Sequence, residues 1–249
     1  QSGAYGGLIF GELRRRALGV SVFASIGNQA DITHADVMEW LEDDPRTRVV
    51  GLFVEEIKNG PRFLETCRRL ARSRAVVALK VGRTRAGRRA AQSHTGSMAG
   101  DGEVVRAAMR QAGVVVARDT DEFFDALAAF SAYPRGISVR KGLAIVTISG
   151  GPCVAAADAA DEAGVPVPEL RPETQAAVRA LVPEFGALRN PVDMTPQCDP
   201  ERFPDCVAAI AADSRIGALL AINVGLDRER FGEAFARAKS KVPVLGFVA

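Results

Sequence analysis

Short apolar runs alternate with segments of helical spacing along almost the whole chain of 249 residues. The apolar runs have the length of buried strands, and they are nearly continuous, as in strands that helices cover on both faces. Alternation of this kind predicts βαβ units with parallel sheets and right-handed crossovers. The expected strands are Val20–Ile26, Val49–Glu55, Ala75–Val81, Val114–Ala117, Leu143–Ile148, Val165–Pro168, Ala218–Asn223 and Val242–Val248. The expected helices are Tyr5–Leu18, Ala35–Glu42, Pro61–Arg72, Glu103–Gln111, Glu122–Ala132, Val154–Glu162, Pro172–Leu181, Pro200–Ala212 and Glu229–Ala238.

The alternation is interrupted once, at the turn-rich segment Ala132-Tyr133-Pro134-Arg135-Gly136. A new series of strands and helices begins after it, and 249 residues are enough for two domains with separate cores. We therefore expect an α/β protein with two tandem flavodoxin-like three-layer domains, residues 1–136 and 137–249, each with a mainly parallel sheet.

Composition excludes several classes of function. A formal net charge of +2 gives no reason to expect nucleic-acid binding. No apolar stretch reaches the roughly 18–20 residues of a membrane span, and the start of the sequence lacks a signal-peptide pattern. The four cysteines lack the C-x-x-C spacing of zinc sites. We expect a cytoplasmic protein with reduced thiols.

One of the two histidines follows the third expected strand. His94 stands in the stretch Gln92-Ser93-His94-Thr95-Gly96-Ser97-Met98-Ala99-Gly100-Asp101, after Lys80-Val81-Gly82-Arg83. We expect a long loop here, rich in Gly and Arg, at the carboxyl end of a strand, where α/β sheets place their ligands. An unprotonated imidazole is a good nucleophile near neutral pH, so His94 is a candidate catalytic residue.

The segment KVGRTRAGRRAAQSHTGSMAGDGEVVRAAMRQAGVVVARDTDEFFDAL resembles the NDP-forming acyl-CoA synthetases. This family includes the ADP-forming acetyl-CoA synthetases and is related to succinyl-CoA synthetase. In it, the histidine of the SHTG-x-x-AG motif becomes transiently phosphorylated. The resemblance implies an acid–thiol ligase that interconverts acyl-CoA, NDP and phosphate with acid, CoA and NTP, with His94 as the phosphohistidine. The alternative is an exposed histidine without chemistry.

A carboxylate should orient the imidazole, because one ring nitrogen must hold a proton while the other attacks phosphorus. Glu55 and Glu56 end the strand that begins at Val49. The family pattern here reads E-G-I, whereas this chain has Glu55-Glu56-Ile57. Glu55 matches the family acid and Glu56 replaces a glycine, so either could face His94, or both could be simply exposed.

Two turns of small residues lead into helices, Ser2-Gly3-Ala4 and Gly150-Gly151-Pro152. A helix N-terminus offers unpaired N–H groups and partial positive charge, and small residues let a phosphate approach them. The resemblance implies that two such termini, one from each domain, face a shared cleft and hold the phosphohistidine. Alternatively, each is an ordinary turn between a strand and a helix.

Three further positions carry weaker predictions. The segment Asn190-Pro191-Val192-Asp193 matches a family turn, and we expect it near the phosphate-facing end of the second domain. His34 follows Thr33, which has capping-box spacing to Asp36, so it is expected to start a helix. Cys153 is expected to be a small buried thiol, although a helix terminus could lower its pKa.

The resemblance also implies partners that this sequence does not contain. Gln1-Ser2-Gly3 looks like the end of a strand-to-helix turn whose strand is missing. Family members carry an upstream CoA-binding domain and an ATP-grasp domain or subunit, which would bind most of the CoA, ATP or ADP and Mg²⁺. Acyl-CoA and phosphate are the expected small-molecule partners, and an oligomer is expected. Two alternatives stay open: a ligand-sensing, non-catalytic synthetase-like region of a protein acetyltransferase, and a pair of domains that only binds another phosphorylated metabolite.

Overall fold

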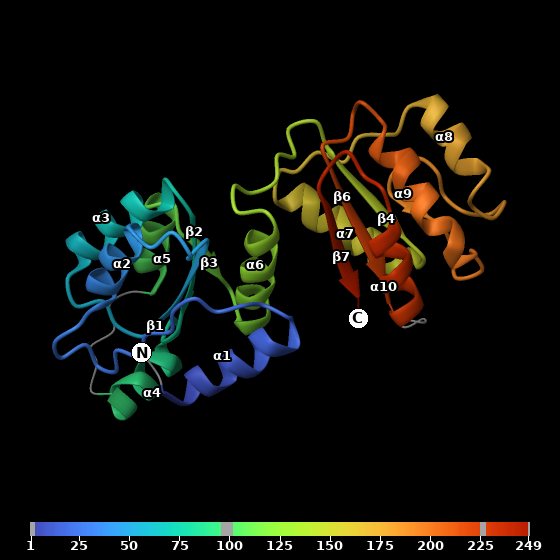
Figure 1. Cartoon of the computed structure of the whole chain (residues 1–249). Coiled ribbons are helices and arrows are strands. Elements are labelled where there is room, and N and C mark those ends of the chain that lie inside the picture. Colours follow the sequence, from blue (N-terminus) through green and yellow to red (C-terminus); the bar gives the residue numbers. More distant parts are fainter. Residues whose placement is uncertain (1–2, 96–101, 225–227, 249) are drawn as a thin grey trace. The chain divides into compact units, whose positions relative to one another are not determined.

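The computed structural model describes residues 3–95, 102–224 and 228–248. The chain forms two compact units, Gln1–Gly136 and Ile137–Ala249 (Figure 1). Each unit contains a sheet whose strand pairs are all parallel, so the predicted α/β class with parallel sheets is confirmed. Within the described ranges, no helix is both long and apolar enough to cross a membrane.

The first unit has a sheet of strand order β1-β2-β3. The strands are β1 (Val49–Val54), β2 (Ala75–Lys80) and β3 (Val115–Ala117). The helices described in this unit are α1 (Gly3–Arg15), α2 (His34–Glu42), α3 (Gly60–Ala71), α4 (Arg85–Thr95), α5 (Gly102–Gln111) and α6 (Thr120–Ala132).

Helices cover both faces of this sheet, because successive strand residues point to opposite sides. Val50, Leu52 and Val54 pack with apolar residues of α2, α3 and α5 in one core cluster. Val77 and Leu79 pack with residues of α6 in a second cluster, against which α1 also packs. The first unit is therefore a three-layer structure, with α1 and α6 on one face and α2, α3 and α5 on the other.

The second unit has a sheet of strand order β5-β4-β6-β7. The strands are β4 (Leu143–Thr147), β5 (Val192–Asp193), β6 (Ala218–Asn223) and β7 (Val244–Val248). The helices are α7 (Gly150–Glu162), α8 (Pro172–Arg179), α9 (Phe203–Ala211) and α10 (Arg228–Arg237), with a short 3₁₀ turn at Pro200–Arg202. Ala144 and Val146 pack against α8, α9 and α10, whereas α7 contacts β4 and β5.

Two predicted strands are wrong. The segment Val20–Ile26 joins no sheet in the described part of the chain, although its sequence pattern is typical of a strand. This segment and β1 both line the same cavity, which separates the segment from the edge of β1. Val165–Pro168 is also irregular, because Pro166 and Pro168 lack the N–H groups that a ladder needs.

Candidate functional site at the carboxyl edge of each sheet

The carboxyl ends of β1 and β2 bring charged residues together in the first unit. Lys80, the last residue of β2, is only 4% exposed. Its ammonium donates to the backbone oxygen of Glu55 at 2.8 Å and to that of Val81 at 2.5 Å. The lysine therefore ties the segment after β1 to the segment after β2.

Burial lowers the pKa of Lys80, and the nearby carboxylates of Glu55 and Glu56 oppose this change. Removing an ammonium from water is costly unless acceptors and negative charges surround it. The sequence interpretation missed Lys80 because it ends a run that otherwise reads as an apolar strand. A single cation at the carboxyl end of a buried strand was the signal that could have identified it.

The two predicted carboxylates lie where expected, directly after β1, and both are half-buried. The carboxylate of Glu56 forms an ion pair with Lys58 at 2.9 Å, and its backbone oxygen accepts from Gln29 at 2.9 Å. Glu55 is held through its backbone oxygen by Lys80. The two neighbouring glutamates therefore have different environments at the same edge of the sheet.

His94 does not lie in a loop, and that prediction is corrected. Its backbone belongs to α4, one residue before this helix ends at Thr95. Four residues separate the end of β2 from the start of this helix, and the hydroxyl of Thr84 accepts from the backbone N–H of Gly87 at 3.0 Å. Arg, Ala and Gln are strong helix formers, so α4 forms without an apolar stripe. The rest of the motif, residues 96–101, lies outside the described residues.

The first small-residue turn leads into α1 at the same edge. Gly3 and Ala4 are the first residues of α1, whereas Ser2 lies outside the described residues. The ring of Tyr5 stacks on Phe53 with centroids 4.0 Å apart, which places the amino end of α1 beside the carboxyl end of β1. The same edge therefore carries a helix N-terminus close to the strand that leads to Glu55.

A further helix, α5, begins close to the segment that follows β2. Gly102 is buried, and a Cβ built on it would lie 2.8 Å from the Cα of Arg83. Only glycine allows the backbone of α5 to approach this segment so closely. We did not single out Gly102 from the sequence; its signal was a glycine at the start of an amphipathic helix.

In the second unit, α7 begins with the predicted small residues. Gly150 and Gly151 are its first two residues, and Pro152 stands in the first turn, where a missing N–H breaks no helical hydrogen bond. The side chain of Ser149 makes no capping hydrogen bond, so it does not cover these amides. The backbone N–H of Ser149 instead donates to the hydroxyl of Thr147 at 2.9 Å.

Asp193 lies against the start of α7. A Cβ built on Gly150 would stand 3.2 Å from a carboxylate oxygen of Asp193, and the other carboxylate oxygen accepts from the backbone of Thr195 at 2.9 Å. Thr195 is 6% exposed, and its hydroxyl has no hydrogen-bond partner within the described residues. Asn223, which ends β6, is fully buried at the same edge.

The predicted turn Asn190–Asp193 is divided between two places. Asp193 lies at the carboxyl edge, but Asn190 does not. The amide of Asn190 donates to the backbone oxygens of Leu143 and Pro168, and its oxygen accepts from the N–H of Ile145. Asn190 therefore secures the amino-terminal part of β4, which corrects its expected position.

The predictions for His34 and Cys153 are confirmed. Thr33 caps α2 with a capping box that includes Asp36, and His34 is the first residue of the helix. Cys153 is buried, and desolvation raises the pKa of its thiol to about 11, which argues against a reactive thiolate.

Comparison with known proteins identifies the family of this chain. The family of succinyl-CoA ligase like flavodoxin domains matches residues 1–130, and the Ligase-CoA domain family matches residues 143–226. The alpha subunit of acetate–CoA ligase [ADP-forming] II from Pyrococcus furiosus is 36% identical over 97% of this chain and 53% of its own length. Acetate–CoA ligase [ADP-forming] I from Archaeoglobus fulgidus is 36% identical over 89% of this chain and 32% of its own length.

A solved structure also matches the whole chain. It is the dinucleotide-forming acetyl-coenzyme A synthetase 1 of Ca. Korarchaeum cryptofilum in complex with phosphate and ADP, with a TM-score of 0.84 and 27% identity. The match covers 100% of this chain and 55% of that one. The chain thus spans about half the length, or less, of these relatives. It belongs to the family of succinyl-CoA ligase like flavodoxin domains, joined here to a Ligase-CoA domain.

Proposed function

We propose that this chain is the phosphotransfer portion of an NDP-forming acyl-CoA synthetase, with His94 as the residue that carries the phosphoryl group. The observation that carries the proposal is the 36% identity to an ADP-forming acetate–CoA ligase subunit over 97% of the chain, in a sequence that retains the SHTG motif. The complete enzyme would interconvert acyl-CoA, NDP and phosphate with free acid, CoA and NTP.

The phosphohistidine step is a displacement at phosphorus. Phosphate attacks the thioester and releases CoA, which gives an acyl phosphate. A ring nitrogen of His94 then attacks the phosphorus, the bond from phosphorus to the acyl oxygen breaks, and the carboxylic acid leaves as its carboxylate. In the final step an oxygen of the NDP attacks the same phosphorus, the P–N bond breaks and NTP forms.

The carboxylates after β1 have a role in this step. When one imidazole nitrogen bonds to phosphorus, the proton on the other nitrogen must be held, and a neighbouring carboxylate stabilises the resulting positive charge. We assign this role to Glu55 in preference to Glu56, because Glu55 stands where the family pattern E-G-I has its acid, whereas Glu56 stands where that pattern has a glycine. Lys80 would keep Glu55 in place through its backbone oxygen.

The two small-residue turns would bind the phosphoryl oxygens. In the first unit the candidates are Ser2, Gly3 and Ala4 at the start of α1, and in the second they are Gly150 and Gly151 at the start of α7, with Pro152 in the same turn. Backbone N–H groups at a helix N-terminus bind phosphate without a metal ion. Whether both turns serve the same phosphoryl group stays a prediction.

The nucleotide and the metal ion are assigned to other parts of the enzyme. Within the described ranges, no group of three or more His, Cys, Asp or Glu side chains could hold a metal ion. ATP or ADP with Mg²⁺ and most of the CoA would bind to an ATP-grasp part and a CoA-binding part. Assembly into an oligomer and a cytoplasmic location complete the proposal.

The test is a phosphorylation experiment on the complete enzyme. Incubation with γ-labelled ATP and Mg²⁺ should give a phosphoryl adduct that is labile in acid and stable in base, unlike phosphoserine or phosphothreonine. His94→Ala should abolish the adduct and the overall reaction. Alanine is the best helix former, so α4 should tolerate this change without loss of folding.

Ser93→Ala is the matched control, because Ser93 adjoins His94 and its exposed hydroxyl donates to the backbone oxygen of Arg89. It should keep the acid-labile adduct. A His94→Ala enzyme with near-normal turnover would exclude the phosphohistidine, and the ligand-sensing alternative would then take its place.

A further inference from the structure

The start of α7 in the second unit carries two backbone N–H groups that the helix itself does not use. Gly150 and Gly151 are its first two residues, so neither amide has an acceptor one turn earlier in the helix. The side chain of Ser149 makes no capping hydrogen bond, and its N–H donates to the hydroxyl of Thr147. Two open donors at the positive end of a helix of 13 residues favour an anion.

A carboxylate faces the same turn of α7. One carboxylate oxygen of Asp193 would stand 3.2 Å from a Cβ built on Gly150. Burial raises the pKa of the Cys153 thiol, and the charge of Asp193 raises it further, so this carboxylate lies close to the first turn of the helix. Among the described residues, Asp193 forms no ion pair that would neutralise it. An anion at the start of α7 therefore meets a second negative charge.

Asp193 has little freedom to move away from such an anion. Its backbone pairs with Thr147 of β4 on one side and exchanges two hydrogen bonds of 3.1 Å with Ala187 on the other. Its second carboxylate oxygen accepts from the N–H of Thr195 at 2.9 Å. A Cβ built on Gly186 would stand 2.7 Å from the backbone oxygen of Asp193, so the preceding loop packs directly on it. The position of the carboxylate is thus a fixed property of this edge.

A third donor lies at the same edge of the sheet. Thr195 stands two residues after β5 and is 6% exposed. Its hydroxyl has no hydrogen-bond partner within the described residues. A buried polar group without a partner is unfavourable, so a bound molecule is one explanation for it. Because the N–H of Thr195 holds Asp193, its hydroxyl lies within reach of a group bound between Asp193 and α7.

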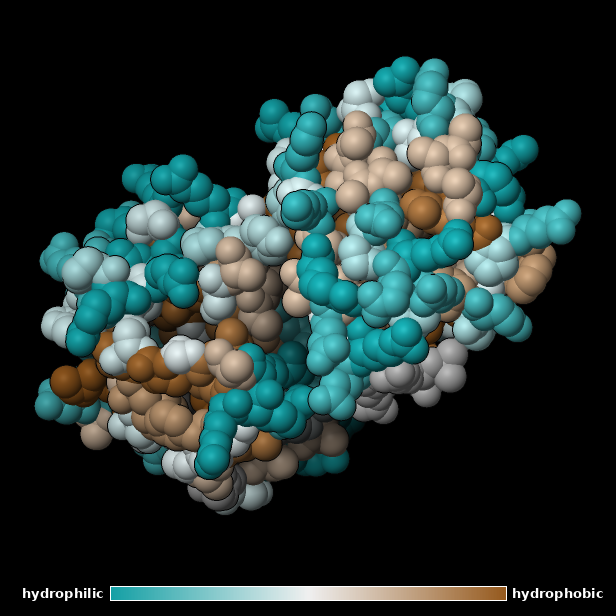
Figure 2. Space-filling model, turned by 45° about the vertical axis from the view of Figure 1, so that its right-hand side comes forward, coloured by the Kyte–Doolittle hydropathy of each residue, from teal (hydrophilic) through white to brown (hydrophobic). Residues whose placement is uncertain are grey.

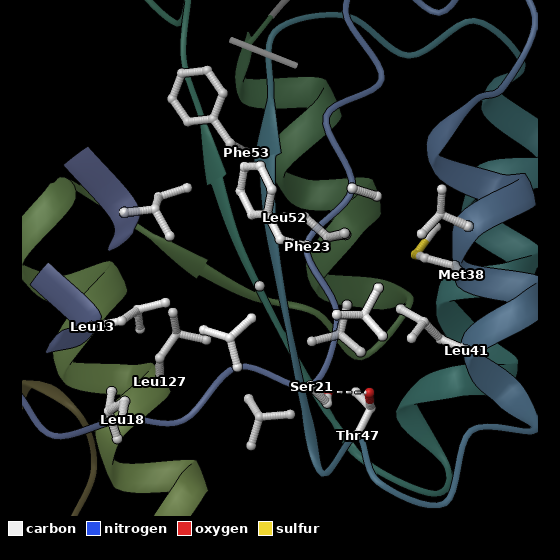
Figure 3. A pocket seen from close by; sticks show the side chains of 18 of the residues that line it. Leu13, Leu18, Ser21, Phe23, Met38, Leu41, Thr47, Leu52, Phe53 and Leu127 are labelled. Atoms are coloured by element: carbon white, nitrogen blue, oxygen red, sulfur yellow. Dashed lines mark hydrogen bonds between the residues drawn. The ribbon is translucent and has the colours of Figure 1, made fainter. Parts of the chain in front are cut away.

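The cavity beside β1 in the first unit, by contrast, does not suit an anion. Its volume is about 210 Å³, and Figure 2 shows hydrophobic surface on the face of this unit that the view presents. Figure 3 shows Leu13, Met38 and Leu127 around it. The hydroxyls of Ser21 and Thr47, which also line it, are bonded to each other at 2.7 Å. Moving a charged group from water into such surroundings is unfavourable.

We propose that the carboxyl edge of the second sheet binds inorganic phosphate in a form that still carries a proton. The amides of Gly150 and Gly151 and the hydroxyl of Thr195 would donate to the negatively charged oxygens, and the P–OH group would donate to Asp193. Asp193 would repel an anion of the same shape that has no proton, such as sulfate. The inference rests on the proposed function, which places a phosphoryl group at this turn, and adds which phosphate species is selected and by which residues.

The proton has a definite place in the proposed reaction. When an oxygen of phosphate attacks the thioester, a C–O bond forms, the C–S bond breaks and CoA leaves as a thiolate. The acyl phosphate that forms has lost the P–OH proton, and the thiolate gains one. Asp193 would accept the proton from phosphate, and the departing thiolate would take it up. Acyl phosphate has no P–OH proton at neutral pH, so this edge favours the substrate of the step over its product.

Phosphate and sulfate, added separately to the chain of 249 residues at neutral pH, test the proposal without turnover. The measured quantity is the chemical shift of the backbone amides of Gly150 and Gly151. Phosphate should shift both signals and bind at least about tenfold more tightly than sulfate, because only phosphate can donate to Asp193. Equal affinities for the two anions, or no shift with phosphate, would overturn the proposal.

Asp193→Asn is the deciding variant, because it keeps the size of the side chain and removes its charge. It should weaken the binding of phosphate and strengthen that of sulfate, which brings the ratio of the two affinities to about one or below. Thr195→Val should weaken both anions and keep the ratio. Asp158→Asn changes an exposed carboxylate of the same helix and is the control, which should alter neither affinity. A preference for phosphate that survives in Asp193→Asn would exclude the assigned role.

Two routes to the adduct on His94 separate this inference from the proposed function. In the complete enzyme the adduct can form from γ-labelled ATP, or from acyl-CoA and labelled phosphate. Asp193→Asn should slow the second route at least about tenfold more than the first, because only the second consumes phosphate. Equal losses on both routes would overturn the role of Asp193 and leave the phosphohistidine in place. An unaltered enzyme that forms no adduct by either route would instead contradict the proposed function.

Discussion

The two units share an architecture but differ at the edge where their parallel strands end. In the first unit, Glu55 and Glu56 follow β1, and a buried Lys80 ends β2. In the second unit, the corresponding neighbours β4 and β6 end at Thr147 and Asn223, which are buried and uncharged. The first edge therefore combines a buried lysine with two glutamates, whereas the second combines the single carboxylate of Asp193, at the end of β5, with hydroxyl, amide and backbone N–H groups.

The two sheets also differ in how completely their inner strands are paired. In the second unit, β4 pairs with β5 and β6, and β6 pairs with β4 and β7, so both inner strands are paired on two sides. In the first unit, β1 pairs only with β2 among the described strands, and a cavity borders its other edge. Ionisable groups and incomplete pairing therefore coincide in the first unit, which should be the more sensitive of the two to pH and to substitution.

The largest expected difference between the two units is the loss of stability at acidic pH. His34, in the first unit, is 6% exposed, and burial lowers its pKa from 6.5 to about 4. His34 takes up its proton at a higher pH in the unfolded state than in the folded state. The free energy of unfolding of this unit should therefore fall as the pH drops from 6.5 towards 4, by about 3 kcal/mol in all. The second unit contains no histidine.

The only tryptophan, Trp40, lies in α2 close to His34, so urea unfolding followed by its fluorescence reports on the first unit. His34→Gln should remove the loss between pH 6.5 and 4. Asp36, with its pKa lowered to about 2, contributes a loss only below its ordinary value of 3.8. A variant with the same acid sensitivity as the natural protein would refute the assignment to His34.

The second effect concerns the buried lysine. Lys80→Met keeps most of the side-chain volume but leaves the backbone oxygens of Glu55 and Val81 without their donor. We expect a loss of about 2 kcal/mol in the free energy of unfolding. Lys58→Met is the control at the same edge. Its ion pair with Glu56 is partly exposed, so the loss should stay below about 0.5 kcal/mol. Equal losses in the two variants would mean that Lys80 does not join the two strand ends.

Sequence reasoning succeeded where the deciding interactions are local. The capping box at Thr33 and the small residues at Gly150 could be recognised because each depends on a few neighbouring residues. It failed where a distant element decides. The pattern of Val20–Ile26 predicts a strand, but a strand also needs an edge to pair with, and the cavity separates this segment from β1. The Gly and Arg residues after the strand that ends at Lys80 predict a loop around His94, but Thr84 and the run of Arg and Ala instead form the helix α4.

The third effect separates the two glutamates. Glu55→Gln should slow phosphohistidine formation at least about tenfold, as expected when a carboxylate that supports an imidazole loses its charge. Glu56→Gln should slow it less, because the carboxylate of Glu56 is paired with Lys58. The measurement is the rate of the acid-labile adduct in the complete enzyme over a range of pH. A larger loss in Glu56→Gln would transfer the orienting role to Glu56.

The smallest effect distinguishes two adjacent glycines in the second unit. A Cβ at Gly150 would stand 3.2 Å from the Asp193 carboxylate, whereas a Cβ at Gly151 meets nothing within 4 Å. Gly151→Ala should therefore be neutral or stabilise the protein by about 0.5 kcal/mol, because alanine favours a helix over glycine. Gly150→Ala should lose that gain and destabilise by about 1 kcal/mol, as Asp193 or α7 must shift.

Urea unfolding measures both variants, with hydrogen exchange at Val146 of β4 as the reading for the second unit. The first unit should be unaffected, since both positions lie in the other one. If Gly150→Ala is as stable as Gly151→Ala, the start of α7 has room for a side chain. The small residue at position 150 would then be kept for the approach of a ligand rather than for contact with Asp193.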